Sequence, residues 1–365
     1  MASVGEDTRV SVVENLGGQA GAWDALVDLM PISSPFLRSW WLGTAAGAVP
    51  QIVLVHRGDR LIGGVALERD RHLGVERLRV LGAGSLCPDH IDAVVATEYR
   101  GDVVAAVRAW LVRPGDRLID LDGLVSGSVL STALGGRARQ ERTAVAPWVT
   151  LVDGYLRRRS ANLRRVVART ERRLSGEAGR CEVVRLDEVE EGLTILRILH
   201  AQRWGDRSAF LGAFTRFAAV CRAAAVAGEL VINILRAGGE TVAVVVSFEV
   251  AGRISHYQSG RAPGARWRSA STVLLARVCE DAGSRGVREA DFLRGDEAYK
   301  DRLTDHRRQL WRIRCAIGPR AVVALHSDIL VERALREAGR VRRELRAQVA
   351  RHPRPRLRSI PSPPG

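Results

Sequence analysis

Residues 229–248 have the sequence Glu-Leu-Val-Ile-Asn-Ile-Leu-Arg-Ala-Gly-Gly-Glu-Thr-Val-Ala-Val-Val-Val-Ser-Phe, and this stretch decides the fold. Runs rich in valine and isoleucine on both sides of a glycine pair predict two antiparallel strands joined by a tight turn, because glycine tolerates the positive φ of such a turn. The earlier stretch 51–67 has the same plan, and Gly58 takes the place of Gly238 in its turn. The chain therefore contains one strand–turn–strand unit twice.

The match between the two halves extends beyond this hairpin. In both halves the order is helices, hairpin, third strand, helix and fourth strand, and matching landmarks stay 171 to 180 residues apart. The paired landmarks are Pro35-Phe36 with Ala209-Phe210, 77–84 with 253–260, the helices 103–111 with 272–282, and the strands 117–120 with 288–291. We therefore predict an α/β fold of two tandem units, each a mixed, mostly antiparallel sheet flanked by helices.

The periodicity also predicts how the chain is divided. We expect an N-terminal unit over 1–153, a basic connecting helix over 154–178 and a C-terminal unit over 179–320. A further amphipathic basic helix is predicted within 321–365, with Ser327 as a possible N-cap. It should end by Pro353, and the proline-rich end of the chain is predicted to be disordered.

Composition and charge exclude several classes of protein. Hydrophobic residues make up 46% of the 365 residues, which is enough for real cores. The net charge of +15 is held mostly by two arginine-rich segments, 155–175 and 331–365, so the rest of the chain is nearly neutral. We therefore expect no DNA partner, and no helix-turn-helix, zinc or P-loop signature is present.

Cellular location and metal content follow from what the sequence lacks. No apolar run reaches the ~20 residues of a membrane helix, and the first residues do not resemble a signal peptide. The five cysteines are isolated from one another, and none has a spacing to histidine that suits zinc. We expect a cytoplasmic protein without a transmembrane segment and without a metal.

Four motifs in the second half carry a family resemblance. They are Leu199-His-Ala-Gln-Arg-Trp204, Ser208-Ala-Phe210, His256-Tyr-Gln-Ser-Gly260 and Asp291-Phe-Leu-Arg-Gly-Asp-Glu-Ala-Tyr-Lys300. Together, over about residues 35–315, the chain resembles the GNAT-superfamily acyltransferases of the CelD-like family, which carry a BioF2-like acetyltransferase domain. That family is similar in turn to the Fem-type transferases, which also contain two GNAT-like domains.

The resemblance implies an N-acyltransferase that moves an acetyl or other acyl group from acyl-CoA to an amine by direct attack. The acceptor would be a sugar, an amino acid or a cell-envelope precursor. Such a reaction needs a base for the amine proton and donors for the oxyanion. The CoA site is expected between the third strand and its helix, at Gln258, Gly260, Arg261, Gly264, Ser269, Ser271 and Thr272.

This segment departs from the family pattern at two places. Arg266 stands where the phosphate loop has a small residue, and 269–271 is Ser-Ala-Ser where the family tends to have Ser-Pro-Gly. Ser269 or Ser271 is still suited to cap the helix and to meet a phosphate.

The candidate catalytic residues are Asp291, Tyr257, His256 and Glu297. For Asp291 we expect partial burial to raise the pKa toward a useful value, with a capping or salt-bridging aspartate as the alternative. Tyr257 is a candidate proton donor to the leaving thiolate or a core tyrosine. Strict alternation would place His256 and Gln258 on one face of their strand and Tyr257 on the other.

The candidate substrate-binding residues are His200, Arg203, Trp204, Arg294 and Lys300. Core packing is the alternative for Trp204. Lys300, the one lysine of the chain, is expected to form an ion pair with Glu297 or to meet a phosphate or a substrate carboxylate. In the first half, Asp89 and His90 are expected in a solvated turn, with the cleft between the halves as the alternative.

Two other functions are compatible with the sequence. A Fem-like transferase would use an aminoacyl-tRNA donor, and the basic connecting helix would suit RNA phosphates. A non-catalytic binding protein that kept the fold is the third possibility, favoured by the altered helix start and disfavoured by the intact 291–300 motif.

Overall fold

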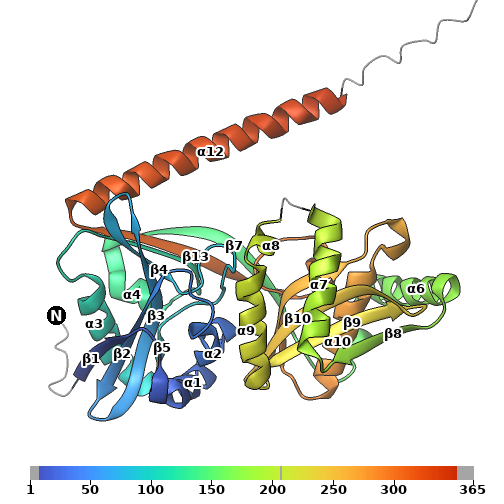
Figure 1. Cartoon of the computed structure of the whole chain (residues 1–365), viewed down its shortest axis with the longest axis horizontal. Helices are drawn as coiled ribbons and strands as arrows, with labels where there is room; N and C mark the ends of the chain where they lie inside the picture. The colour runs from blue at the N-terminus through green and yellow to red at the C-terminus, as the bar shows by residue number, and fades with distance from the viewer. Residues whose placement is uncertain (1–7, 206–207, 352–365) are drawn as a thin grey trace, which may run out of the picture.

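The computed structural model describes residues 8–205 and 208–351, and its two halves lie side by side in Figure 1. The first half contains β1 (Thr8–Val13), α1 (Ala20–Asp28), α2 (Ser39–Leu42), β2 (Val49–Arg57), β3 (Arg60–His72), β4 (Val75–Val80), β5 (Val94–Val95), α3 (Arg100–Leu111), β6 (Arg117–Leu124), α4 (Val129–Leu134) and β7 (Arg139–Thr150). The predicted hairpin is confirmed as β2 and β3, and Gly58 in its turn has a φ of +56°.

The second half repeats this plan. It contains β8 (Cys181–Leu186), α7 (Val189–Trp204), α8 (Ala209–Gly212), α9 (Phe214–Val226), β9 (Leu230–Ala237), β10 (Glu240–Val250), β11 (Arg253–Arg261), α10 (Ala270–Ser284), β12 (Glu289–Asp291), α11 (Lys300–Leu303) and β13 (His306–Ile317). The deciding stretch forms the antiparallel pair β9 and β10, with Gly238 and Gly239 at φ of +60° and +83°.

All the named strands belong to one sheet. Its order is β1-β2-β3-β4-β6-β13-β7-β12-β11-β10-β9-β8, and β5 pairs with β3. Only β4 with β6 and β11 with β12 are parallel among the strands that the structure describes, so the sheet is mostly antiparallel, as predicted.

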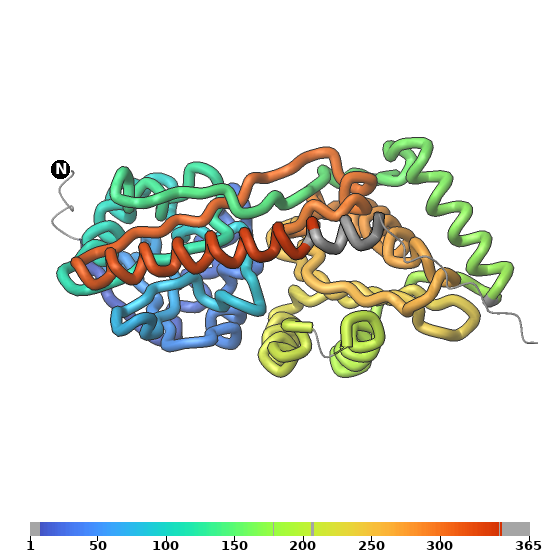
Figure 2. Tube along the Cα trace, turned by 90° about the horizontal axis from the view of Figure 1, so that it is seen from above, coloured from blue at the N-terminus to red at the C-terminus, as the bar shows by residue number. Residues whose placement is uncertain are grey.

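The last strand of each half pairs with the other half. β13 comes at the end of the second half but lies between β6 and β7, antiparallel to both. β7 comes at the end of the first half and its final residues pair with β12. Figure 2 shows these two strands running together from one half to the other. The sheet is therefore continuous across the molecule.

Two large hydrophobic cores among the described residues stabilise this sheet. One extends from the first half, where α1 and α3 cover the strands, to the face of the second half covered by α7 and α9. The other lies on the opposite face of the second half, beneath α10 and the connector. The connector is helical as predicted, but it is two helices, α5 (Tyr155–Arg158) and α6 (Ala161–Ala178), because the Ser160 side chain accepts a hydrogen bond from Leu163 N–H and caps a new helix.

The C-terminal helix α12 (Pro319–Arg351) is longer than predicted. It begins at Pro319 directly after Gly318, whose φ is +84°, so Ser327 lies inside the helix and is not its N-cap. Ala321, Ala324 and Ile329 are buried where the helix packs on the sheet. The predicted disordered tail lies outside the described residues from 352 on. No helix in the described part is long and apolar enough to span a membrane.

Candidate active site

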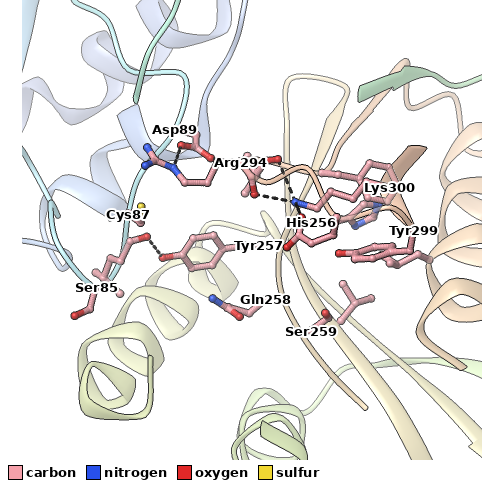
Figure 3. A pocket seen from close by; sticks show the side chains of 16 residues that line it. Ser85, Cys87, Asp89, His256, Tyr257, Gln258, Ser259, Arg294, Tyr299 and Lys300 are labelled. Atoms are coloured by element: carbon pink, nitrogen blue, oxygen red, sulfur yellow. Dashed lines mark hydrogen bonds and ion pairs between the residues drawn. The ribbon is translucent and has the colours of Figure 1, made fainter. Parts of the chain in front are cut away.

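A cavity of about 240 Å³ lies where the two halves meet. The first half contributes the loop between β4 and β5, and the second half contributes β11, α10 and the loop that follows β12, as Figure 3 shows. The lining residues are Ser85, Leu86, Cys87, Asp89, Val245, His256, Tyr257, Gln258, Ser259, Leu275, Phe292, Leu293, Arg294, Glu297, Tyr299 and Lys300.

Strand β11 forms one wall of the cavity with an unpaired edge. β12 pairs with β11 only at Arg253, Ile254 and Ser255. From His256 to Arg261, no described strand lies on that side of β11, so its backbone N–H and C=O groups are available to another extended chain.

A β-bulge in this wall changes the expected alternation after Tyr257. Opposite β11, Val246 pairs with Gln258 and the next residue, Ser247, pairs with His256, so Tyr257 is the extra residue. A bulge re-aims side chains and leaves the extra residue out of the hydrogen-bond ladder. His256 contacts Cys279 of α10 and Tyr257 packs against Phe217 of α9, so these two side chains lie on opposite faces as predicted. His256, Tyr257 and Gln258 all line the cavity at this edge of the sheet.

Asp291 is fully buried, and three basic side chains surround it. Its Oδ2 lies 2.8 Å from Arg253 Nη2, 3.0 Å from Arg308 Nη1 and 3.0 Å from His90 Nε2, and its Oδ1 accepts a hydrogen bond from Leu293 N–H. Burial alone would raise the pKa of Asp291, but His90, Arg253 and Arg308 hold it well below its usual range. The expected rise is therefore wrong, and the salt-bridging alternative describes this residue. Asp291 also does not line the cavity.

His256 is a buried, neutral histidine in the cavity wall. Its Nδ1 is 2.9 Å from Ser247 Oγ, and its Nε2 is 3.6 Å from Cys279 Sγ. Burial lowers the pKa of His256 to about 4, and the nearby Lys300 adds to the shift while Asp291 opposes it. Both ring nitrogens are engaged with neighbours, so the ring is held in one orientation.

Glu297 and Lys300 form the predicted ion pair, with Lys300 Nζ 2.9 Å from Glu297 Oε2. Lys300 Nζ also donates to the carbonyl of Arg294 at 2.8 Å, and the side chain is 5% exposed. The Glu297 side chain is 56% exposed and lies at the rim. Between them in sequence, Tyr299 lines the cavity, and burial raises its pKa to about 12.

Two predicted site residues join the halves together. Arg294 donates from Nε and from its backbone N–H to Asp89 at 2.6 and 2.7 Å, and from Nη1 to Asp122 at 2.9 Å. Tyr257 donates its hydroxyl proton to the carbonyl of Leu86 across the same boundary. Its ring packs against Phe217 and Trp41, and burial raises its pKa well above the usual value. Both side chains are thus occupied by structural contacts.

Asp89 and His90 are not in a solvated turn. Each is 1% exposed, and Asp89 lines the cavity while His90 reaches Asp291. The alternative prediction, that Asp89 and His90 lie in the cleft between the halves, describes these residues better. The partners that bury them, Arg294 and Asp291, lie some two hundred residues away in the chain, so local composition indicated only a polar turn.

The predicted CoA segment lies at the end of the unpaired edge. Ser269 has a φ of +68° and makes no side-chain cap to α10, because a capping serine needs an extended backbone. Ser271 and Thr272 are inside the first turn of α10, so neither caps it. Gly260 is buried against α7, where an added Cβ would lie 2.9 Å from Leu199 Cβ, and Gly264 has a φ of +97° in open space.

Three arginines gather at this end of β11. Arg203 and Arg268 are close enough to Arg261 to lower its pKa, after the larger effect of burial. None of the three has an acidic partner within the described ranges 8–205 and 208–351. Together with the free backbone N–H groups at the start of α10, they form a positive site suited to phosphate groups.

His200 and Trp204 stand apart from the cavity. His200 Nε2 is 2.8 Å from Ser208 Oγ, and the ring packs against Phe210. Trp204 is 50% exposed and lies under the Arg203 guanidinium, so it is neither a core residue nor part of the cavity wall. The expected pocket wall from α7 is therefore not seen, and Arg203 alone approaches the site. Among the residues described, no cluster of histidine, cysteine and carboxylate side chains could hold a metal.

Comparison with known proteins supports the architecture. Residues 161–301 match the sequence profile of the GNAT acetyltransferase domain. No curated protein sequence matches the chain. The solved structure of FemX is similar with a TM-score of 0.60 and 10% identity, over 84% of this chain and 96% of that one. The C-terminal domain of a putative lysylphosphatidylglycerol synthetase from Agrobacterium fabrum has a TM-score of 0.56 and 12% identity, over 86% and 97% of the two chains.

A conserved protein of unknown function from Bacteroides thetaiotaomicron gives a TM-score of 0.55 at 11% identity, over 84% of this chain and all of that one. At such identities these likenesses establish the fold and nothing more. The second half thus contains a GNAT-type acetyltransferase domain, and the two-unit fold recurs over nearly the whole length of these structures.

Proposed function

We propose that this chain, whose residues 161–301 carry a GNAT acetyltransferase domain, is an N-acyltransferase that uses an acyl-CoA donor. One observation carries the proposal. The unpaired edge of β11 runs from the three arginines and the start of α10 directly to the cavity between the halves.

Each part of an acyl-CoA has a matching feature along this path. The pyrophosphate and ribose phosphate suit Arg203, Arg261 and Arg268 together with the N-terminal N–H groups of α10. The pantetheine arm is an extended chain with amide groups, so it suits the free backbone groups of β11. The thioester would then lie at the bulge beside the cavity.

The cavity contains groups suited to acyl transfer. We assign Glu297 as the base that takes the proton of the attacking amine, because its carboxylate is at the cavity rim and open to water. The backbone N–H of the bulged Tyr257 is suited to stabilise the oxyanion. Tyr299 keeps its proton at neutral pH and is suited to donate it to the leaving thiolate.

This assignment moves the proton donor from Tyr257 to Tyr299. The Tyr257 hydroxyl already donates to Leu86 O, whereas the Tyr299 hydroxyl has no hydrogen-bond partner among the described residues. Figure 3 shows the hydroxyl end of Tyr299 directed toward the interior of the cavity. The acceptor amine enters on the side of the first half, where Ser85 and Asp89 complete the wall.

The donor is tested first by calorimetric titration of the full chain with acetyl-CoA. We expect saturable binding that the paired change Arg261→Gln with Arg268→Gln weakens about tenfold or more, because two phosphate contacts are lost. The control pair is Arg139→Gln with Arg185→Gln, since both arginines are exposed and have no ion-pair partner in the described part of the chain. Absent binding, or equal loss in both pairs, would contradict the proposal.

The chemistry is tested separately from binding. Glu297→Gln and Tyr299→Phe should each lower turnover with an amine acceptor by about 10²-fold or more and leave acetyl-CoA affinity unchanged. Tyr257→Phe serves as the control for hydroxyl loss and should affect stability more than turnover. Normal turnover in Glu297→Gln would remove this residue from the mechanism.

The exposed arginines of the connector favour a second candidate, an aminoacyl-tRNA donor. Both α5 and α6 present arginines to solvent, namely Arg157, Arg158, Arg164, Arg165, Arg169 and Arg172. RNA phosphates would suit this surface, and binding would then fall steeply with salt. RNA binding that is lost in Arg164→Gln with Arg165→Gln, combined with no binding of acetyl-CoA, would favour this donor. No binding of either donor would favour a non-catalytic binding protein.

A further inference from the structure

Helix α12 has two apolar stripes, and only one of them contacts the protein. The first consists of Ala321, Ala324 and Ile329, which are buried against the sheet. The second consists of apolar residues exposed to solvent, and the larger ones are Val323, Leu330, Val331, Leu335 and Val341, which are 67%, 63%, 58%, 67% and 45% exposed. Exposed alanines at 334 and 338 fill the gaps between them.

The exposed apolar residues spread around the helix: Val323, Leu330 and Val341 lie opposite the buried side, whereas Leu335 lies between Ala321 and Ala324 around the helix axis. At 100° per residue, the centres of the two stripes lie roughly 130° apart around the helix. The outer stripe runs from Val323 to Val341, a length of about 27 Å. Figure 1 shows α12 along one edge of the molecule with both halves on one side, and Figure 2, viewed from above, shows it in front of them. A flat surface that approaches from that side meets α12 first.

Charge indicates what kind of surface this is. Residues 330–365 contain ten arginines and three glutamates. One of the glutamates, Glu332, is already paired with Arg312 and Arg314 on β13. Arg333 and Arg342 border the outer stripe and are exposed, with no acidic partner in the described ranges. The other two glutamates, Glu337 and Glu344, both pair with Arg340, so the segment that carries the stripe keeps a net positive charge.

The apolar stripe and the positive charge beside it together favour one kind of partner. A second copy of the chain would bring two strongly positive segments together, which charge repulsion opposes. A nucleic acid would satisfy the arginines but would leave the apolar stripe in water. An anionic lipid bilayer satisfies both, because it accepts apolar side chains at the acyl boundary and arginines at its headgroups.

We propose that the outer face of α12, defined by Val323, Leu330, Val331, Leu335 and Val341, binds the surface of an anionic membrane. The helix lies in the plane of the interface with this face inward. The protein is thereby held at the membrane with its cavity in the aqueous phase. The inference goes beyond the acyltransferase proposal and does not depend on it.

Co-sedimentation of the full chain with vesicles tests the inference. We expect the protein to pellet with vesicles of phosphatidylcholine and phosphatidylglycerol, to remain in solution with pure phosphatidylcholine, and to dissociate as salt is raised. The variant Leu330→Ser, Leu335→Ser, Val341→Ser should lose binding by about tenfold or more, because insertion of the apolar face is lost. Arg333→Gln with Arg342→Gln should weaken binding mainly at low salt.

A matched control replaces two other exposed leucines and one valine. Leu29→Ser, Leu73→Ser, Val226→Ser removes side chains that are 72%, 62% and 92% exposed elsewhere, and it should bind vesicles as the wild type does. Three results would overturn the inference. These are no binding of the wild type to anionic vesicles, an equal loss in both triple variants, and a dimer in light scattering that only the α12 triple variant converts to a monomer, which would identify a second copy as the partner.

Discussion

Asp291 lies in the most specific motif of the sequence, and its neighbours determine its role. Arg253 belongs to β11, Arg308 to β13 and His90 to the other half of the molecule. The sequence indicated an important, partly buried carboxylate. It could not indicate that basic side chains from three separate segments converge on it, because that follows from the strand order.

Replacement of this carboxylate tests its structural role. Asp291→Asn removes the fully buried carboxylate beside Arg253, Arg308 and His90, while Glu289 remains as an acidic partner of both arginines, so the free energy of unfolding should fall by about 3 kcal/mol. Denaturant unfolding measures this loss, and Asp59→Asn in the exposed β2–β3 turn is the control. Unchanged stability combined with lost turnover would indicate that Asp291 takes part in the reaction.

His256 makes stability depend on pH. Its pKa is about 4 in the folded protein and 6.5 in the unfolded chain, so the unfolded chain binds more protons between these values. Stability contributed by the neutral ring is therefore present above pH 6.5 and is lost as pH falls toward 4, by about 3 kcal/mol. Unfolding of the wild type and of His256→Gln at pH 7 and pH 4 measures this difference. A wild type and variant with the same pH dependence would contradict it.

At the scale of elements, β11 has one feature that the sequence pattern predicted and one that it could not predict. The repeat predicted β11 as the third strand of the second half, and the 256–260 motif predicted that this strand carries site residues. The bulge at Tyr257 was not predicted, because an extra residue in one strand is defined only by the register of its neighbour. The sequence also did not indicate Tyr299 as a site residue, although it lies inside the 291–300 motif.

A glycine lets helix α10 approach the short segment between β7 and α5. A Cβ on Gly283 would lie 2.6 Å from the carbonyl oxygen of Val152, a backbone atom that cannot move away easily. Gly283→Ala should therefore destabilise the protein, by about 1–3 kcal/mol, although alanine is the better helix former.

A second helical glycine allows helix propensity to be tested where packing does not oppose a larger side chain. Gly176 in α6 has nothing within 4 Å of an added Cβ. Gly176→Ala should therefore stabilise the protein by up to about 1 kcal/mol. Thermal unfolding of both variants measures the contrast, and a stabilising Gly283→Ala would show that α10 does not pack closely on residue 152.

At the scale of the whole molecule, the internal repeat predicted two similar α/β units and their element order. It did not predict that β7 and β13 pair across the halves, because the local sequence of a strand does not specify which distant strand it joins. The exchange places β13 between two strands of the first half, so the sheet of that half contains a strand from the C-terminal part of the chain.

A truncated chain tests how far the halves depend on each other. A protein that ends at residue 305 lacks β13, so β6 and β7 each lose a paired neighbour and Ile313 and Cys315 leave the core. We expect it to show no cooperative thermal transition by circular dichroism. A chain that ends at Arg351 keeps β13 and should unfold in one transition like the full protein. Cooperative unfolding of the shorter chain would show that the first half folds alone.

The exchanged strand also sets an order of events at the ribosome. The first half leaves the exit tunnel long before β13 has been translated, so its sheet has a vacant position while the second half is being made. During that interval the edges of β6 and β7 are open to wrong partners, including nascent chains on neighbouring ribosomes. Synthesis rate between residues 151 and 317 thus becomes a determinant of yield, and chaperones that shield strand edges should act on this protein before its last strand emerges.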